Sequence, residues 1–272
     1  FCGTPKGVGS WSHKLFTQAI NEPDWNAWQF TTIEGGNVDQ DEIDSARRDL
    51  DDKTFAQEYL ATFNTYSGVV YYHFDYKGTV KPCEDPHTGV IHIGQDFNFS
   101  PQCCVIAQVT NDAIHVFDEI HMLTSSTDEV AKEIRARYPQ SKVIVYPDPS
   151  GKQRKASAGG KTDFSILHNA GFELKARNIH TPIKDRVNAV NARLLSADGQ
   201  RKLYVDPKCK HTVESLMRLT YTEGTSQIAK NSGLDHASDA LGYLVDYLYP
   251  IKKKYSTTEE PQQWSFGTKK RW

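Results

Sequence analysis

The chain has 272 residues, of which 38% are hydrophobic and 24% charged, and its formal net charge is −2. These values are typical of a soluble globular protein. No stretch approaches the roughly 18 to 20 apolar residues that a membrane helix requires, so we expect no membrane partner. The net charge alone does not predict nucleic-acid binding, and the length allows one sizeable domain with an attached segment.

The chain begins with Phe1 rather than methionine and lacks the layout of a signal peptide, so we expect it to be part of a longer protein. Five cysteines are an odd number. Cys103 and Cys104 are adjacent in a predicted strand, where their side chains would point to opposite faces. Cys209 and His211 have no second ligand pair at zinc-finger spacing. The cysteines therefore indicate reduced thiols in a cytosol-like compartment.

Apolar residues recur at helical intervals in a predicted helix from about Asp39 to Phe63. The breaker sequence at residues 65–68 follows, and we place a domain boundary there. Beyond Pro250 the chain is polar and basic, which predicts a flexible tail. The predicted organisation is an N-terminal segment of residues 1–65, a main domain of residues 66–250 and a basic tail of residues 251–272.

The main domain begins with three predicted strands that form an antiparallel meander, and a hairpin turn at residues 110–112 joins the second strand to the third. They are Gly89–Asp96, Cys103–Val109 and Ala113–Ile120. A helix, a strand and then alternating elements follow, which predicts an α/β domain with a mixed sheet flanked by helices. This order fits a ribonuclease H-like fold. The later elements are helices near 127–138, 163–169, 183–196, 212–219 and 234–248, and strands near 142–146, 172–176 and 203–205.

Two aspartates stand where predicted strands end. Asp96 closes the first apolar strand, and Asp148 follows the strand at residues 143–146. Carboxylates at strand ends can hold Mg²⁺, which binds one or two carboxylates together with water and phosphate oxygens. Each residue also has a simpler interpretation, because Asp96 could cap a turn and the Pro-Asp-Pro-Ser-Gly sequence around Asp148 is favourable turn chemistry.

A third candidate, Asp239, lies in the last predicted helix, opposite its apolar stripe and on the same side as Asp235 and Asp246. Periodicity alone therefore favours a solvated acidic face. Two features favour a site instead. Ala240 and Gly242 are small enough to let another backbone approach, and Asp235 lies one turn from Asp239, where like charges are unfavourable unless a cation compensates them.

Asp118 and Glu119 end the third strand and are second-tier metal candidates, since only one of them can point to a given face. Basic residues gather after Asp148, where they could neutralise DNA phosphates or form ordinary solvated faces. The candidate DNA-binding residues are Lys152, Arg154, Lys155 and Lys161, and a second group follows at Lys175, Arg177, Lys184, Arg186 and Arg193.

These motifs, in this order and spacing, resemble the large terminase subunits of tailed phages over about residues 1–250. Four segments are similar to successive nuclease motifs of that family: Gly94-Gln95-Asp96-Phe97-Asn98, Asp118-Glu119-Ile120, Asp148-Pro149-Ser150-Gly151 and Asp235 to Leu241. The first seven residues, including Gly3, Thr4 and Pro5, resemble the segment that couples ATP hydrolysis to movement. Residues 55–61 resemble the helix that leads out of the ATPase motor.

The resemblance implies a ribonuclease H-like nuclease with a partial ATPase segment in front of it. Asp96, Asp148 and Asp239 would form the metal-binding triad, with Asp235 as a further ligand candidate. The implied activity is a Mg²⁺- or Mn²⁺-dependent endonuclease that cuts concatemeric viral DNA by two-metal hydrolysis, with Asp96 contacting both ions. The implied partners are double-stranded DNA, the portal protein and the small terminase subunit, in the host cytoplasm.

The family's phosphate-binding loop, G-x-x-x-x-G-K-[ST], is absent, so we do not expect this chain to hydrolyse ATP by itself. Two other functions stay open at this point. A transposase or junction resolvase of the same fold would use similar acids on specific or branched DNA. A non-catalytic DNA- or capsid-binding module would use the acids as turn and surface residues, and would bind no divalent ion there.

Overall fold

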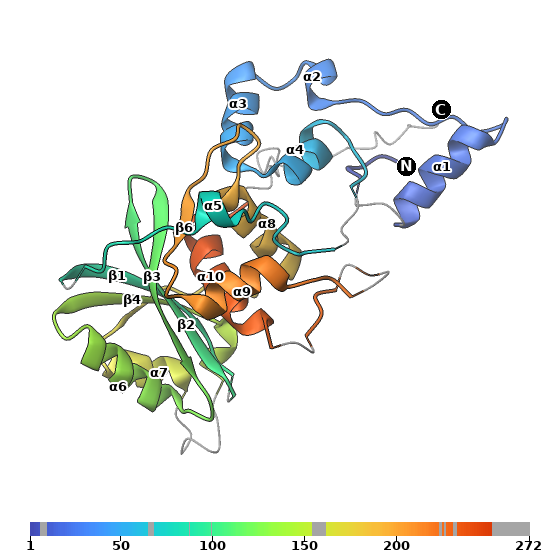
Figure 1. The fold of residues 1–272 in the computed structure, drawn as a ribbon. Coiled ribbons are helices and arrows are strands. Elements are labelled where there is room, and N and C mark those ends of the chain that lie inside the picture. Colours follow the sequence, from blue (N-terminus) through green and yellow to red (C-terminus); the bar gives the residue numbers. More distant parts are fainter. Residues whose placement is uncertain are drawn as a thin grey trace, which may run out of the picture.

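The structure, a computed structural model, describes residues 1–5, 10–64, 68–86, 88–98, 100–153, 162–222, 225, 227–230 and 233–251. A six-stranded mixed sheet in the order β5-β4-β1-β2-β3-β6 forms its centre (Figure 1). The expected mixed sheet is therefore confirmed. The strands are β1 (Gly89–Asp96), β2 (Gln102–Thr110), β3 (Ala113–Met122), β4 (Ser141–Pro147), β5 (Glu173–Leu174) and β6 (Leu203–Val205).

Strands β1 to β3 form the predicted antiparallel meander. Asn111 and Asp112 connect β2 to β3 with φ angles of 50° and 63°, the left-handed values that a tight hairpin turn uses. The other strands pair in parallel: β4 with β1, β5 with β4 and β6 with β3. Strand β5 is shorter than the predicted strand at residues 172–176, since only two of its residues pair with β4.

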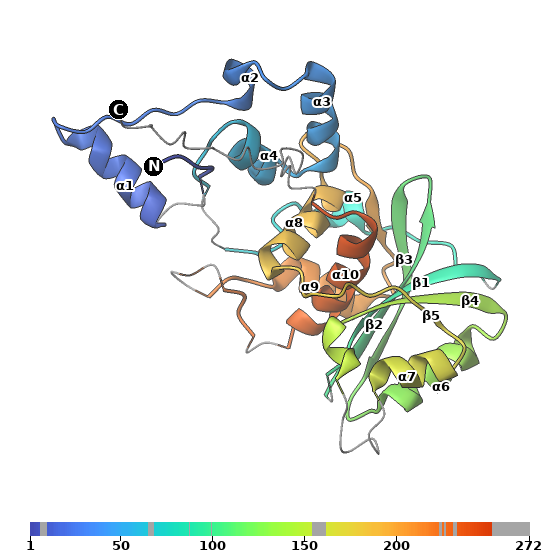
Figure 2. The same cartoon turned by 180° about the vertical axis from the view of Figure 1, so that it is seen from behind.

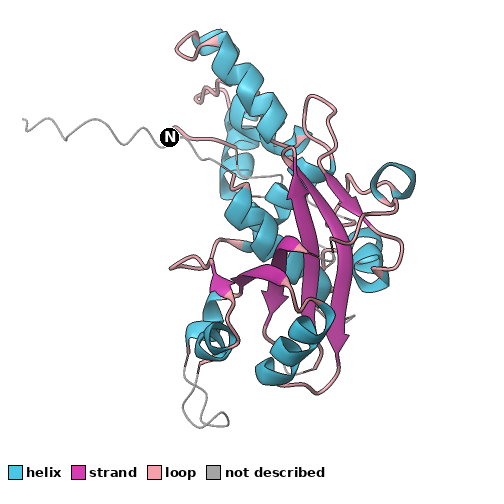
Figure 3. Cartoon of the chain, turned by 90° about the vertical axis from the view of Figure 1, so that its left-hand side faces the viewer, coloured by secondary structure: helices cyan, strands magenta, loops and turns pink. Residues whose placement is uncertain are grey.

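Helices cover both faces of the sheet (Figures 1 and 2). Figure 3 shows the strands as a twisted layer between them. Helices α6 (Thr127–Arg137) and α7 (Asp163–Asn169) lie on one face, and α8 (Ile183–Leu194), α9 (Lys210–Arg218) and α10 (Asp235–Leu248) lie on the other.

Side chains on β2 alternate between the two faces, as the pleat of a strand requires. Cys103 and Val105 belong to the core shared with α8, α9 and α10, whereas Cys104 and Ile106 belong to the core under α6 and α7. All five cysteines are free, so the structure contains no disulfide. The two cores to which Cys103 and Cys104 belong agree with the expectation that these side chains point to opposite faces.

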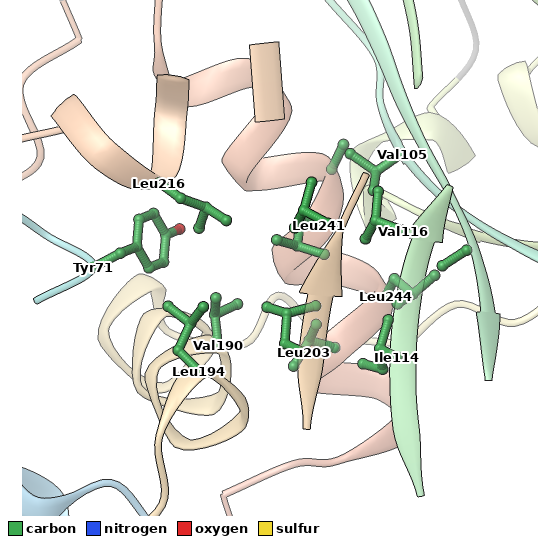
Figure 4. Packing of buried hydrophobic residues seen from close by; sticks show 14 of the residues in the cluster. Tyr71, Val105, Ile114, Val116, Val190, Leu194, Leu203, Leu216, Leu241 and Leu244 are labelled. Atoms are coloured by element: carbon green, nitrogen blue, oxygen red, sulfur yellow. The ribbon is translucent and has the colours of Figure 1, made fainter. Parts of the chain in front are cut away.

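The larger core fills the space between the sheet and the last three helices. Figure 4 shows Leu241 and Leu244 of α10 beside Val105 and Val116 of the sheet, with Val190 of α8 farther from the strands. Leu241, Leu244, Val105 and Val116 are completely buried. Burial of such side chains, roughly 1.5 to 3 kcal/mol each, holds α10 against the sheet.

Helix α10 lies unusually close to β1. A Cβ atom added at Gly94 would approach the backbone oxygen of Ala240 to 2.0 Å, so only glycine fits at this position. The predicted solvated acidic face of α10 is wrong, because Asp235 and Asp246 are only 7% and 4% exposed. Arg177 and Thr181, in the segment before α8, donate hydrogen bonds to the Asp246 carboxylate at 2.7 Å.

The N-terminal part contains α1 (Trp11–Asn21), α2 (Thr32–Gly35), α3 (Gln40–Asp49) and α4 (Asp52–Tyr59), with the short α5 (Tyr76–Thr79) leading toward the sheet. The single helix predicted for residues 39–63 is wrong. The helix ends at Asp49, and Asp51 caps a new one by accepting a hydrogen bond from the Thr54 amide at 3.0 Å.

Helices α3 and α4 share a small core of their own, formed by Ile43, Ala46, Leu50 and Phe55. No helix among the residues described is both long enough and apolar enough to cross a membrane. The predicted tail lies outside the described residues from residue 252 onward. The predicted boundary near residue 65 stays a prediction.

Candidate functional site

The two strand-end aspartates lie beside each other. In the parallel pair of β1 and β4, Gln95 is opposite Pro147, and the Asp148 amide donates to the Gln95 carbonyl oxygen at 3.0 Å. Neighbouring strands lie about 4.8 Å apart, so Asp96 and Asp148 leave the sheet next to each other. Asp96 is 5% exposed.

Helix α10 brings two further acids to the same place. Its first half passes over β1 near Gly94, and this carries Asp235 and Asp239 toward the end of that strand. Asp96, Asp148, Asp235 and Asp239 all line one cleft of about 690 Å³. The other lining residues are Asn98, His180, Thr181, Pro182, Ile183, Arg186, Lys230, His236 and Tyr243.

His236 links α10 to the end of β1. Its Nδ1 atom lies 3.2 Å from Oδ2 of Asp96, and the Asn98 side-chain amide donates to the same oxygen at 2.5 Å. The hydrogen bond with Asp96 raises the pKa of His236, and the charges of Asp235 and Asp96 act in the same direction against partial burial. A protonated imidazole is therefore favoured beside this carboxylate.

Arg186 of α8 is the partner of Asp239. Its guanidinium donates a hydrogen bond to Oδ1 of Asp239 and lies over the ring of Tyr243, 4.4 Å from the ring centre. Burial raises the pKa of Asp239, and the like charges of Asp96 and Asp235 raise it further, while Arg186 lowers it. Burial and the two nearby acids therefore outweigh the effect of Arg186 on the pKa of this carboxyl.

Asp148 is held by its own turn. Its Oδ1 atom accepts a hydrogen bond from the Ser150 amide at 2.9 Å, and Nδ1 of His180 lies 3.6 Å from the same oxygen. Asp148 therefore both stabilises its own turn and lines the cleft.

The second-tier acids do not line the cleft. Asp118 faces α6, where it accepts hydrogen bonds from the Tyr138 hydroxyl at 2.6 Å and from Arg137 at 2.9 Å. Glu119 faces the other side and accepts from the backbone amides of His211 and Thr212 at the start of α9. The two side chains point to opposite faces, as expected, and each has a structural role.

The candidate DNA-binding cations are only partly described. The Lys152 ammonium donates to the carbonyl oxygen of Arg177 at 3.1 Å, and Arg154, Lys155 and Lys161 lie outside the described residues. Several basic residues of the second group pair with acids of the chain itself, which leaves less of their charge for DNA. These pairs are Arg177 with Asp246, Arg186 with Asp239, Arg193 with Asp112 and Lys175 with Glu173.

Gly3, Thr4 and Pro5 also lie away from the cleft lining; Gly3 is exposed and Pro5 is buried. Their position therefore gives them no part in the acidic site.

The residues of the cleft suit a divalent cation. Carboxylate oxygens are the ligands that Mg²⁺ and Mn²⁺ prefer. Oδ1 of Asp235 is buried without a hydrogen-bond partner, which is an unfavourable state that a cation would relieve. The other three acids accept hydrogen bonds from protein donors, Asp96 from Asn98, Asp148 from the Ser150 amide and Asp239 from Arg186. Among the described residues, only Asp51, Asp52 and His73, outside this cleft, bring three ligand atoms within 4.8 Å of one another.

The sequence alone assigned no individual role to four residues that line the cleft, namely His236, Arg186, His180 and Lys230. His236 offered one signal, because it precedes Asp239 by three positions on a helix and such residues share a face. Arg186 stood out only as one of the second group of basic residues, and His180 gave no signal. Their contacts depend on how distant segments pack.

The sequence profile of the family described as the terminase RNaseH-like domain matches residues 93–248. The large terminase subunit of Escherichia phage T5 is 23% identical over 264 residues, covering 89% of this chain and 56% of the relative. This chain therefore spans little more than half the length of that relative.

Two solved structures have the same fold. The large terminase of a thermophilic bacteriophage gives a TM-score of 0.68 at 17% identity, over 89% of this chain and 60% of that chain. The nuclease domain of the P22 large terminase gives a TM-score of 0.53 at 16% identity, over 68% of this chain and 95% of that chain. The expected ribonuclease H-like fold is confirmed by the family match.

Proposed function

We propose, from the premise that this chain belongs to the family of terminase RNaseH-like domains, that it is a divalent-metal-dependent endodeoxyribonuclease. The resemblance to phage large terminase subunits is confirmed by the family match. The observation that carries the proposed activity is the convergence of Asp96, Asp148, Asp235 and Asp239 on one cleft. The first two come from neighbouring strand ends and the last two from a helix packed on those strands.

Asp96, Asp148 and Asp239 would hold the ions, with Asp235 as a fourth carboxylate. A bound pair of Mg²⁺ or Mn²⁺ ions would supply an activated water and would stabilise the leaving oxygen during phosphodiester hydrolysis. Asn98 and His236 orient Asp96 through hydrogen bonds to its Oδ2 atom. Arg186 would hold Asp239 in place until that carboxylate takes up its metal-binding role.

The proposed substrate is double-stranded DNA, and in packaging it would be concatemeric viral DNA. Lys230, which lines the cleft, and Lys152, which follows Asp148 closely, would contact phosphates. Phosphate contacts carry little sequence information, and cutting should therefore be largely non-specific and weaken with added salt.

We also propose, from the family alone, that the portal protein and the small terminase subunit are partners. The assignment of Gly3, Thr4 and Pro5 to a motor-coupling segment and the boundary near residue 65 stay predictions.

The family match favours a terminase over a transposase or resolvase. Comparing linear, supercoiled and branched DNA as substrates separates these classes, because a resolvase would prefer the branched one.

The decisive experiment is the substitution Asp96→Asn, assayed by plasmid cleavage in Mg²⁺ and in Mn²⁺. We expect cleavage to fall to the level without enzyme, because the central carboxylate of the cleft loses its charge. The matched control is Asp128→Asn on α6, whose side chain is 59% exposed on the opposite face of the sheet. Circular dichroism of both variants checks the fold.

Cleavage retained by Asp96→Asn, in a preparation free of contaminating nuclease, contradicts the proposed site. A protein that folds normally and shows neither cleavage nor binding of Mn²⁺ at the four acids would instead be a non-catalytic DNA- or capsid-binding module.

A further inference from the structure

A second group of metal-ligating side chains lies outside the nuclease cleft, where α4 meets the segment before α5. One carboxylate oxygen from each of Asp51 and Asp52 and one ring nitrogen of His73 all lie within 4.8 Å of one another. Nε2 of His73 is 2.9 Å from Oδ1 of Asp52. This group is called the junction cluster below.

Both acids lie at the N-terminal end of α4. Asp51 caps α4, and its Oδ1 atom accepts hydrogen bonds from the Thr54 amide at 3.0 Å and from the Tyr72 hydroxyl. Asp52 is the first residue of α4. His73 comes from a segment 21 positions later in the sequence, so the cluster joins two separate parts of the chain.

Helix capping explains only part of this arrangement. A cap requires one side-chain oxygen, and Oδ1 of Asp51 supplies it. Asp51 is nevertheless 0% exposed, and its Oδ2 atom is buried without any hydrogen-bond partner. A buried carboxylate oxygen left unpaired is strongly unfavourable, and such atoms in a folded protein usually have a water or an ion beside them.

We propose that the junction cluster binds a divalent cation of the zinc class, with Asp51, Asp52 and His73 as its protein ligands. Imidazole together with carboxylates suits Zn²⁺ or Co²⁺, whereas Mg²⁺ prefers oxygen ligands alone. The Asp52 side chain is 62% exposed and that of His73 is 13% exposed, so water can complete the coordination from the solvent side. The ion would bind between the His73 ring nitrogen and the carboxylate oxygens of Asp51 and Asp52.

Such an ion would fasten α4 to the body of the sheet domain. Two positions before His73, Tyr71 is buried in the larger core, and the Val70 amide donates to the Leu219 carbonyl oxygen at 2.8 Å. The segment that carries His73 is therefore fixed to the sheet domain. A cation shared with Asp51 and Asp52 would add a direct link to the N-terminal helices.

The test is calorimetric titration of Zn²⁺ into the full chain, in a background carrying Asp96→Asn and Asp148→Asn. This background weakens metal binding at the nuclease cleft, so the outcome of the titration does not depend on whether the proposed nuclease function is correct. Adding His73→Gln should remove one bound Zn²⁺ per chain, because glutamine keeps a donor for Asp52 but has no imidazole nitrogen. The matched control is His168→Gln, an exposed residue of α7, which should leave the stoichiometry unchanged.

Asp52→Asn serves as a second variant, since its exposed side chain is not part of any core, and it too should lose the ion. Circular dichroism before titration shows that each variant is folded. In the background protein, Zn²⁺ should also raise the melting temperature by a few degrees, and neither variant should show this rise. Equal Zn²⁺ binding by the background, His73→Gln and Asp52→Asn proteins would overturn the proposal.

Discussion

The contact between His236 and Asp96 joins a helix residue to a strand residue 140 positions away. Asp96 was predictable because it ends an apolar strand, and strand ends commonly present functional side chains. The partner was not, because nothing in the local sequence specifies which distant side chain meets it. The same holds for Arg186, which reaches Asp239 only because α8 packs against α10.

The His236 contact predicts a pH-dependent contribution to stability. Its pKa is raised in the folded protein above the ordinary value of 6.5, chiefly by the hydrogen bond with Asp96. The folded state therefore binds the proton more tightly than the unfolded state does. The stabilisation is fully present below the unfolded pKa and is lost as the pH rises through the folded pKa.

The test is His236→Gln, measured by urea unfolding in EDTA. The free energy of unfolding lost by this variant should be larger at about pH 5.5 than at about pH 8.5, by roughly 1 kcal/mol, the usual net contribution of one hydrogen bond. His168→Gln is the control, and its effect should not change between the two values. An equal loss for His236→Gln at both values would contradict the inferred contact.

At the scale of the elements, β1 to β3 and the main helices follow from alternating and helical apolar patterns. The position of α10 does not. Helical periodicity identified its apolar stripe correctly, but it could not indicate that distant residues such as Arg177 and Thr181 cover acids on the other side. Asp235 and Asp246 therefore looked solvated and are buried. The break at Leu50 and Asp51 was missed because neither residue is a glycine or a proline, although Asp51 is a favourable helix cap.

The close approach of α10 to β1 predicts the effect of Gly94→Ala. The added Cβ would lie 2.0 Å from the Ala240 backbone oxygen, and a backbone atom can move away only if the helix moves. We expect the free energy of unfolding to fall by about 1 to 3 kcal/mol, as overpacking usually causes. DNA cleavage should fall as well, because the displaced helix carries Asp235 and Asp239.

Urea unfolding and plasmid cleavage measure these two effects. The matched control is Gly35→Ala in α2, where an added Cβ would have no neighbour within 4 Å. This control should leave both quantities nearly unchanged. If Gly94→Ala were as stable and as active as the control, helix and strand would not be in the close contact described.

At the scale of the whole molecule, the described residues differ sharply in how well they are packed. Strand β2 lies in the middle of the sheet with helices on both faces, and Val105, Ile106 and Ala107 are completely buried. Helix α1 buries only Ala19, and α2 buries none of its residues. Half of the large hydrophobic side chains that are exposed fall within residues 1–33: Phe1, Trp11, Ile20, Trp25, Trp28, Phe30 and Ile33.

This difference predicts the order in which backbone amides exchange with deuterium. Local opening requires less free energy where few apolar side chains are buried, so α1 and α2 should exchange first. Helices α3 and α4 have a small core of their own and should follow. Strands β1 to β3 and helix α10 should exchange last, near the rate set by global unfolding. Mass spectrometry of peptides from the intact chain, sampled from seconds to hours, measures this order. Protection of α1 equal to that of β2 would show that residues 1–33 pack far more tightly than their exposed tryptophans indicate.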